Sequence, residues 1–133
     1  MIVREARAEE ALDVRRILDA AMLETGDVEG RIAAGDVLVA VTDGDDRLLG
    51  TLVLEPREHG AYVSAIAVRR RRRDRGVGTA LVDRALEREG RLTARFDEGV
   101  RPFYESLDFS LEAIDGRRYQ GYKSAPPAGR GTD

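Results

Sequence analysis

The sequence predicts a single α/β domain, in which strands and helices share one buried core. Three observations support this fold class. The chain has 133 residues, which suffices for one domain with a buried core and is too short for two. Its apolar residues follow the helical period in some segments and alternate with polar residues, as in strands, in others. Short clusters of Asp and Gly separate several of the strand patterns, as expected of hairpin turns.

The N-terminal residues predict a short strand and two helices. Ile2 to Arg4 form the strand pattern. From Glu9 to Leu23 apolar residues fall at i, i+3, i+4, i+7 and i+8, which predicts an amphipathic helix that ends at Gly26. A short second helix is predicted within Asp27 to Gly35.

The next segment predicts three strands joined by turns. Val37 to Thr42 and Leu48 to Glu55 are strand patterns, and the Asp-Gly-Asp-Asp sequence at 43–46 joins them as a hairpin. Pro56 to Gly60 forms a second connection. Ala61 to Val68 is apolar on both faces, so we expect this strand near the centre of the sheet, covered on both sides.

A helix, a strand and a short helix follow. The helix runs from after Gly78 to about Glu89 and ends at Gly90. Leu92 to Phe96 alternates as a strand does, and Pro102 begins the short helix. In the longer helix the predicted buried residues are Leu81, Val82, Ala85 and Leu86, and the predicted exposed ones are Asp83, Arg84, Glu87 and Arg88.

The chain closes with a predicted strand pair, Phe109 to Ala113 and Arg117 to Lys123, around an Asp-Gly turn. The remaining residues contain two prolines, two glycines and no core residue, which predicts a disordered tail. We therefore expect the domain to cover 1–123 and the tail to cover 124–133.

The composition, 42% apolar and 35% charged, is that of a soluble globular protein. The chain has no cysteine, which excludes disulfides, thiolate metal sites and a cysteine nucleophile, and a cytoplasmic location is expected. No apolar run approaches the roughly 20 residues that span a bilayer, and the N-terminus lacks a secretory pattern. We expect no membrane association and no bound metal.

The net charge of −3 gives no general argument for nucleic-acid binding. Positive charge is instead concentrated between Arg69 and Arg75, while Lys123 is the only lysine. For Arg69 to Arg72 two interpretations are open, a solvated loop and a weak nucleic-acid patch.

The segment between the apolar strand and the helix has the features of a pyrophosphate-binding loop. The arginine-rich run leads into Gly76-Val-Gly78, where the helix begins. A helix N-terminus offers backbone N–H groups without partners and a partial positive charge. Glycines permit close approach of a phosphate, and arginines add charge-assisted hydrogen bonds.

Two common phosphate-binding motifs fit this segment poorly. A Walker A loop requires a lysine, and none is present there. A dinucleotide fingerprint could use Gly76, Gly78 and, further on, Asp97. However, Leu81 occupies its third glycine position, and a seven-residue charged segment replaces its tight turn.

Arg73-x-x-Gly76-x-Gly78, after a strand ending in Ala67-Val68, resembles the acetyl-CoA-binding signature of the GNAT N-acetyltransferase superfamily, Gln/Arg-x-x-Gly-x-Gly/Ala. The later segment PFYESLDF, residues 102–109, resembles the family's A-x-x-F-Y-x-x-x-G-F pattern. Both motifs stand in the family's order, and the resemblance covers roughly Ile2 to Lys123. Two departures are Asp97, where asparagine is common, and Asp108, where glycine is usual and we expect the left-handed turn to be retained.

The resemblance implies a central mixed, mostly antiparallel sheet of six to seven strands, flanked by about four helices, with splayed strands 4 and 5. It implies transfer of an acetyl group from acetyl-CoA to an amine acceptor, a small molecule or a peptide. The backbone of Ile66 and Val68 would pair with the pantetheine arm, and the N–H of Ile66 would stabilise the oxyanion. The cofactor-binding residues would be Ile66, Ala67, Val68, Arg73, Arg75, Gly76, Val77, Gly78 and Thr79.

Tyr104 is the candidate general acid. The leaving thiolate belongs to a thiol with a pKa of about 8.5, and a phenol with a pKa of about 10 can protonate it. The helix pattern places Phe103 and Leu107 on the buried face, which turns Tyr104 towards a neighbouring surface. The alternative is a core tyrosine packed behind Phe103.

The sequence identifies no single base for the acceptor amine. Glu55 at a strand end, Glu58 and His59 are candidates, as is a water relayed from a strand carboxylate. A second functional hypothesis is a non-catalytic module that binds acyl-CoA as a sensor or regulator. The acceptor and the oligomeric state stay open, and a homodimer formed through the last strands is one option.

Overall fold

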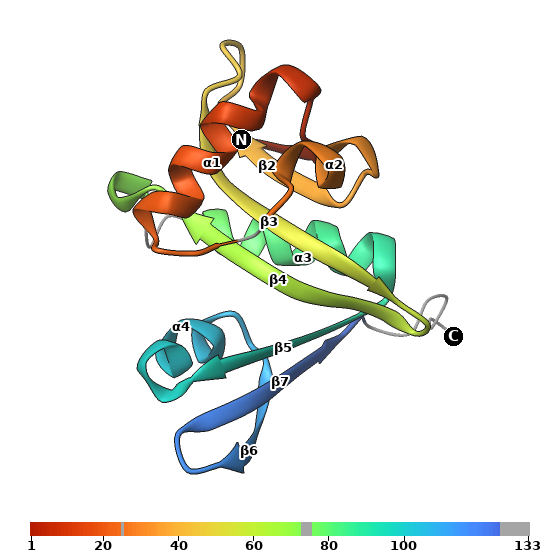
Figure 1. Cartoon of the computed structure of the whole chain (residues 1–133), viewed down its shortest axis with the longest axis vertical. Helices are drawn as coiled ribbons and strands as arrows, with labels where there is room; N and C mark the ends of the chain where they lie inside the picture. The colour runs from red at the N-terminus through yellow and green to blue at the C-terminus, as the bar shows by residue number, and fades with distance from the viewer. Residues whose placement is uncertain (25, 73–75, 126–133) are drawn as a thin grey trace, which may run out of the picture.

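Within the described residues, a seven-stranded mixed sheet forms the centre of the molecule and four helices cover its two faces (Figure 1). The computed structural model describes residues 1–24, 26–72 and 76–125. The strands are β1 (Ile2–Glu5), β2 (Val37–Val41), β3 (Leu48–Arg57), β4 (Gly60–Val68), β5 (Arg91–Asp97), β6 (Ser110–Asp115) and β7 (Arg118–Ser124). The helices are α1 (Ala11–Ala20), α2 (Val28–Ala33), α3 (Val77–Glu89) and α4 (Arg101–Ser106), with short 3-10 turns at Ala8–Glu10, Arg70–Arg72 and Glu98–Val100.

The strand order is β1-β2-β3-β4-β5-β7-β6, and all neighbours are antiparallel except β4 and β5. These two parallel strands pair only at Ala61–Leu92 and Tyr62–Thr93. Figure 1 shows them close together at one end and diverging towards the other. The predicted fold class is confirmed, including the central position of β4 and the splay between the fourth and fifth strands.

Each face of the sheet has its own buried cluster. Helices α1 and α2 cover one face, where Val14, Leu18 and Val39 belong to one core. Helix α3 covers the other face, and α4 packs near the far end of β5. The predicted buried face of α3 is confirmed, because Leu81, Val82, Ala85 and Leu86 are all buried.

Helix α1 ends at Ala20, so the prediction that it continues to Gly26 was wrong. Met22 has a φ of 60°, in the left-handed region. The N–H of Leu23 then donates to the carbonyl of Leu18 at 2.9 Å. This is a Schellman-type helix end, with Met22 in the position that glycine usually takes.

The connection predicted over Pro56 to Gly60 is shorter in the structure. Strand β3 continues through Arg57, and a two-residue turn at Glu58 and His59 leads into β4. Proline is tolerated there because β2 pairs with β3 only as far as Val53, so this part of β3 has a free edge.

Two residue placements also differ from expectation. Arg88, predicted to be exposed, is half-buried and lies 3.2 Å from Glu89 and 3.7 Å from Glu5 of β1. Ser124 ends β7, and the N–H of Ala125 donates to the carbonyl of Gly90 at 2.9 Å. These two residues of the predicted tail therefore belong to the described fold, whereas 126–133 lie outside the described residues.

Candidate functional site

The divergence of β4 and β5 opens a cavity of about 830 Å³. It combines residues from the loop after α1, β4, the start of α3, the end of β5 and α4. Its lining comprises Ala21, Leu23, Val63, Ser64, Ala65, Ile66, Ala67, Val68, Gly76, Val77, Gly78, Thr79, Arg95, Phe96, Asp97, Val100, Phe103, Tyr104, Ser106 and Leu107. All the predicted cofactor-binding residues that the structure describes are in this set.

Strand β4 presents backbone hydrogen-bonding groups to the cavity. The N–H of Arg69 donates to Leu49 of β3 at 2.8 Å, so the backbone of Arg69 faces β3. Because successive residues of a strand direct these groups to opposite sides, Ile66 and Val68 direct theirs away from β3. Strand β5 has already diverged at this point, so it leaves that edge of β4 without a strand partner among the described residues.

Strand β4 also contains a bulge. Val53 of β3 pairs with Ala65, while the next residue, Leu54, pairs with Val63. Ser64 therefore has no counterpart in β3, and it lines the cavity. Sequence reasoning missed Ser64, although a serine within an otherwise apolar strand was an available signal.

The N-terminus of α3 opens into the same cavity. Gly76 precedes the helix with a φ of 80°, a conformation that favours glycine. A Cβ at Gly76 would meet no atom of the described residues within 4 Å, so these residues leave space beside the first helical N–H groups. Val77, the first residue of α3, is buried in the core, while Gly78 and Thr79 line the cavity and are less buried. The predicted contributions of Arg73 and Arg75 lie outside the described residues.

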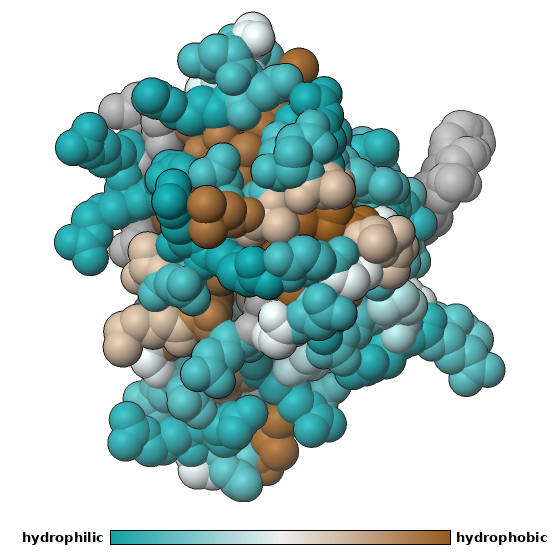
Figure 2. Space-filling model, turned by 45° about the horizontal axis from the view of Figure 1, so that its top comes forward, coloured by the Kyte–Doolittle hydropathy of each residue, from teal (hydrophilic) through white to brown (hydrophobic). Residues whose placement is uncertain are grey.

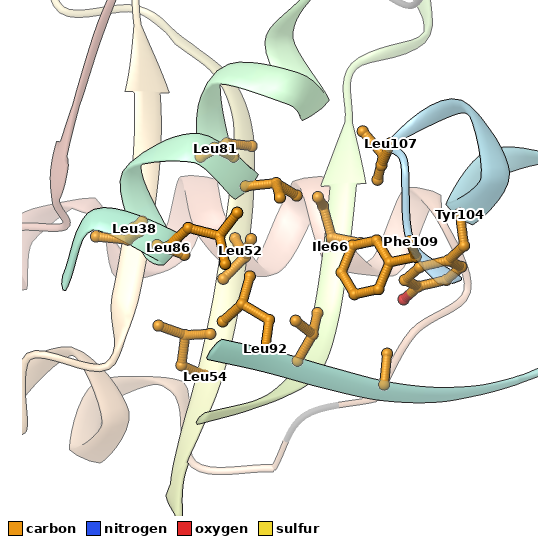
Figure 3. Packing of buried hydrophobic residues seen from close by; sticks show 14 of the residues in the cluster. Leu38, Leu52, Leu54, Ile66, Leu81, Leu86, Leu92, Tyr104, Leu107 and Phe109 are labelled. Atoms are coloured by element: carbon orange, nitrogen blue, oxygen red, sulfur yellow. The ribbon is translucent and has the colours of Figure 1, made fainter. Parts of the chain in front are cut away.

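Tyr104 occupies a different position from the one that the helix pattern predicted. It is buried, with 8% of its surface exposed, while Phe103 is half-buried. Its ring stacks on Phe96 with centroids 4.1 Å apart and meets Phe103 and Phe109 edge-on. Figure 3 shows Tyr104 and Phe109 beside Ile66 of β4. The helix pattern placed Phe103 and Leu107 on the buried face; Leu107 is buried, but Tyr104 is buried in place of Phe103 because β5 and the segment after α4 enclose this side of the helix.

Burial also changes the acidity of this phenol. Desolvation raises the pKa of Tyr104 to about 12, with a smaller contribution from Tyr62. Its hydroxyl makes no hydrogen bond to another described residue, although the residue lines the cavity. The phenol is therefore protonated at neutral pH and has a hydrogen to donate into the cavity.

The candidate bases lie away from this cavity. Glu55 accepts hydrogen bonds from Arg31 at 3.3 Å and from Arg57 at 3.2 Å, one at each carboxylate oxygen. Glu58 and His59 form the turn at the opposite end of β4 from the α3 N-terminus. None of the three lines the cavity as the described residues define it.

The two departures from the family pattern have distinct surroundings. Asp108 has a φ of 65°, so the expected left-handed turn is retained with aspartate in place of glycine. Asp97 lines the cavity at the end of β5 and lies 3.2 Å from Arg118.

In the described ranges, no group of three or more His, Asp or Glu side chains is placed to hold a metal ion. Every helix in the same ranges is too short or too polar to cross a membrane.

Comparison with known proteins identifies relatives of this fold. The sequence model of the acetyltransferase (GNAT) domain matches residues 33–111. No curated protein matches the chain. A Bacillus cereus GNAT acetyltransferase structure is 15% identical, covers 95% of this chain and 98% of its own, and has a TM-score of 0.77.

Two further structures have informative ligands or names. Ard1 from Thermoplasma volcanium is 18% identical, with a TM-score of 0.75, and the match covers 95% of this chain and 98% of that one. A Mycobacterium tuberculosis protein solved with CoA and NLQ is 21% identical, with a TM-score of 0.71 and coverage of 85% and 74%. At these identities the likeness shows the shared fold.

Proposed function

From the premise that this chain belongs to the GNAT acetyltransferase family, we propose that it transfers an acetyl group from acetyl-CoA to an amine acceptor. The observation that carries the proposal is the free edge of β4 at Ile66 and Val68, which shares one cavity with the α3 N-terminus and Tyr104. In this arrangement the edge of β4 can pair with an extended arm, and the α3 N-terminus can bind an anion. Tyr104 can protonate a leaving group.

The proposed function assigns acetyl-CoA one orientation in the cavity. Its pantetheine arm pairs with the backbone of Ile66 and Val68, alongside Ala67. Its pyrophosphate lies at the N–H groups of the α3 N-terminus, where Gly76 presents no side chain to the approaching anion. The full proposed set is Ile66, Ala67, Val68, Gly76, Val77, Gly78 and Thr79, together with Arg73 and Arg75. The relative solved with CoA supports this assignment, since it has the same fold.

Transfer proceeds by direct attack of the amine on the thioester carbonyl. The new C–N bond forms, the carbonyl oxygen becomes negatively charged, and the N–H of Ile66 stabilises it. The C–S bond then breaks, and Tyr104 donates its proton to the departing sulfur. The phenol is a weak acid in this buried site, and under this proposal desolvation of the departing thiolate would raise the pKa of the thiol that it protonates.

Replacing Tyr104 with Phe tests the role of the hydroxyl. We expect kcat to fall by at least about tenfold, because general acid catalysis typically contributes about 10²–10⁴-fold. Affinity for acetyl-CoA and the melting temperature should change little, since no described residue bonds to the hydroxyl. Thiol release from acetyl-CoA with a panel of amines, polyamines, amino acids and peptides measures kcat and also identifies the acceptor.

Tyr122→Phe is the matched control, because the Tyr122 hydroxyl donates to Glu112 on β6, outside the cavity. It should retain full activity. A Tyr104→Phe variant with unchanged kcat removes Tyr104 from the mechanism.

The burial of Tyr104 favours a second candidate function, a non-catalytic module that binds acyl-CoA. In that case Tyr104 is a packing residue, and acetyl-CoA binds without turnover for any amine in the panel. Binding measured by calorimetry, beside the thiol-release assay, separates the two functions.

Glu55 is the proposed base only through an intervening water, because it does not line the cavity and both of its oxygens contact arginines. Under this proposal Glu55→Gln lowers kcat/KM most strongly at low pH, where fewer acceptor amines are already neutral.

A further inference from the structure

A second cavity of about 780 Å³ lies beside the first, at the end of β4. Half of its ten described lining residues are arginines and the other half are aliphatic. The arginines are Arg16, Arg47, Arg69, Arg70 and Arg71, and the aliphatic residues are Ile17, Ala20, Ala21, Leu49 and Val68. Among these residues there is no carboxylate, although acidic residues outnumber basic ones in the chain as a whole.

The arginines come from three separate parts of the chain. Arg16 is on α1, Arg47 precedes β3, and the other three follow β4. Figure 2 shows hydrophilic side chains projecting at the edge of the molecule where β4 ends in Figure 1. The fold therefore assembles a cationic site that the arginine-rich loop alone would not make.

Nearby carboxylates neutralise this cluster only weakly. Asp13 is the described ion-pair partner of Arg16, at a long distance of 3.9 Å. In the turn before Arg47, Asp43 pairs with the N-terminal ammonium at 3.0 Å and Asp46 pairs with Arg7 at 3.2 Å. The guanidinium groups at the cavity therefore keep a local positive potential that favours an anion.

Hydrogen bonds to β3 fix the position of Arg69, at the start of the arginine-rich segment. Arg69 donates from Nε to the carbonyl of Leu48 at 2.6 Å, and its N–H donates to Leu49 at 2.8 Å. The next residues form a 3-10 turn, which holds Arg70 and Arg71 at the cavity wall. Ala21 and Val68 line both cavities, so a ligand in the larger cavity can extend into this one.

We propose that this arginine pocket binds a phosphate or carboxylate group carried by a ligand of the neighbouring cavity. The arginines supply charge-assisted hydrogen bonds, and the aliphatic wall accommodates the carbon chain that carries the anion. The anion belongs to the amine acceptor or to the 3′-phosphate of acetyl-CoA. Naming these two sources rests on the proposed function, whereas the anion site itself does not.

Inorganic pyrophosphate is the first probe, followed by amide chemical shifts in NMR spectra. We expect shifts at Ala20, Ala21 and Leu49 in the wild type. The double variant Arg16→Gln/Arg47→Gln should weaken this binding at least about fivefold, since each exposed charged contact contributes modestly. Arg84→Gln is the control, because Arg84 is exposed on α3, pairs with Glu87 and lies outside the pocket.

Two further measurements identify the source of the anion. If the 3′-phosphate binds here, the double variant loses affinity for acetyl-CoA and keeps its affinity for 3′-dephospho-acetyl-CoA. If the acceptor supplies the anion, both cofactor affinities persist, and KM rises for amines that carry a carboxylate or phosphate but not for neutral analogues.

Either result supports the arginine pocket. The proposal is overturned if pyrophosphate causes no shifts at these amides, or the same shifts in the double variant. Failure of the proposed function has a different signature, since acetyl-CoA would then not turn over with any amine while the pyrophosphate shifts persist.

Discussion

At the scale of single residues, Tyr104 combines a packing role with the proposed role of general acid. Its ring stacks on Phe96 and contacts Phe109 edge-on, which places most of it in the core. The residue also lines the cavity in which the leaving group of the proposed reaction would lie. Because the charged phenolate is poorly solvated there, burial holds this group in its protonated form.

An alkaline titration checks this environment. The folded pKa of Tyr104 is about 12 against 10.0 for an ordinary tyrosine, so the folded state favours the neutral phenol. Its contribution to stability is fully present below pH 10 and is lost as pH rises through about 12. The hydrogen bond to Glu112 also raises the pKa of Tyr122, so late phenolate absorbance has two sources. The Tyr104 step is the one that Tyr104→Phe removes and that Tyr122→Phe leaves in place. A late absorbance change of the same size in Tyr104→Phe and in the wild type contradicts the assignment.

At the scale of elements, the two edges of β4 differ in their pairing. Towards β3 it is paired along its length except at the bulge around Ser64, and towards β5 it is paired only at Ala61 and Tyr62. Beyond that point, among the described residues, β4 has a short unpaired edge inside the molecule. Because this edge faces a cavity, it is shielded from pairing with strands of other chains. The proposed pairing with pantetheine uses this edge as an extended peptide uses the edge of a sheet.

Hydrogen exchange within β4 tests this arrangement. The amides of Ile66 and Val68 should exchange faster than those of Ala65 and Ala67, which face β3. Acetyl-CoA should slow the exchange of the first pair and leave the second pair nearly unchanged. The two pairs serve as controls for each other, since all four residues lie on one strand. Equal protection in the free protein argues against a free edge.

At the scale of the whole molecule, the sheet consists of two halves joined at the base of β4 and β5. Gly60 lies at this junction with a φ of 108°. A Cβ there would come within 2.3 Å of the carbonyl oxygen of Arg91, the first residue of β5. The two halves can approach this closely only because residue 60 has no side chain.

Gly60→Ala should therefore destabilise the protein by about 1–3 kcal/mol more than Gly44→Ala. Gly44 also has a positive φ, 94°, but a Cβ there meets no atom within 4 Å, so its variant reports backbone strain alone. Urea unfolding of both variants and the wild type measures the difference. Equal losses would mean that the contact with Arg91 relaxes at no cost.

The sequence predicted most elements because their patterns are local. The helical spacing in α3 identified Leu81, Val82, Ala85 and Leu86 as buried, and the alternation in β5 identified Leu92 and Phe96. Two predictions failed for different reasons, one because of a distant segment and one because of a local helix end. Arg88 is half-buried because it lies against Glu5, more than eighty positions earlier, and α1 ends where its own backbone hydrogen bonds close around Met22.

For the candidate site, the sequence by itself determined the strand, the glycines at the start of α3 and the aromatic segment, since each is a short contiguous pattern. Only the tertiary structure decided how far β4 and β5 diverge, that Tyr104 is buried, and that Arg16 and Arg47 join the arginines after β4. The physical reason is that splay, burial and local potential depend on segments far apart in the chain. The helical spacing and strand alternation of a short segment carry no information about these contacts.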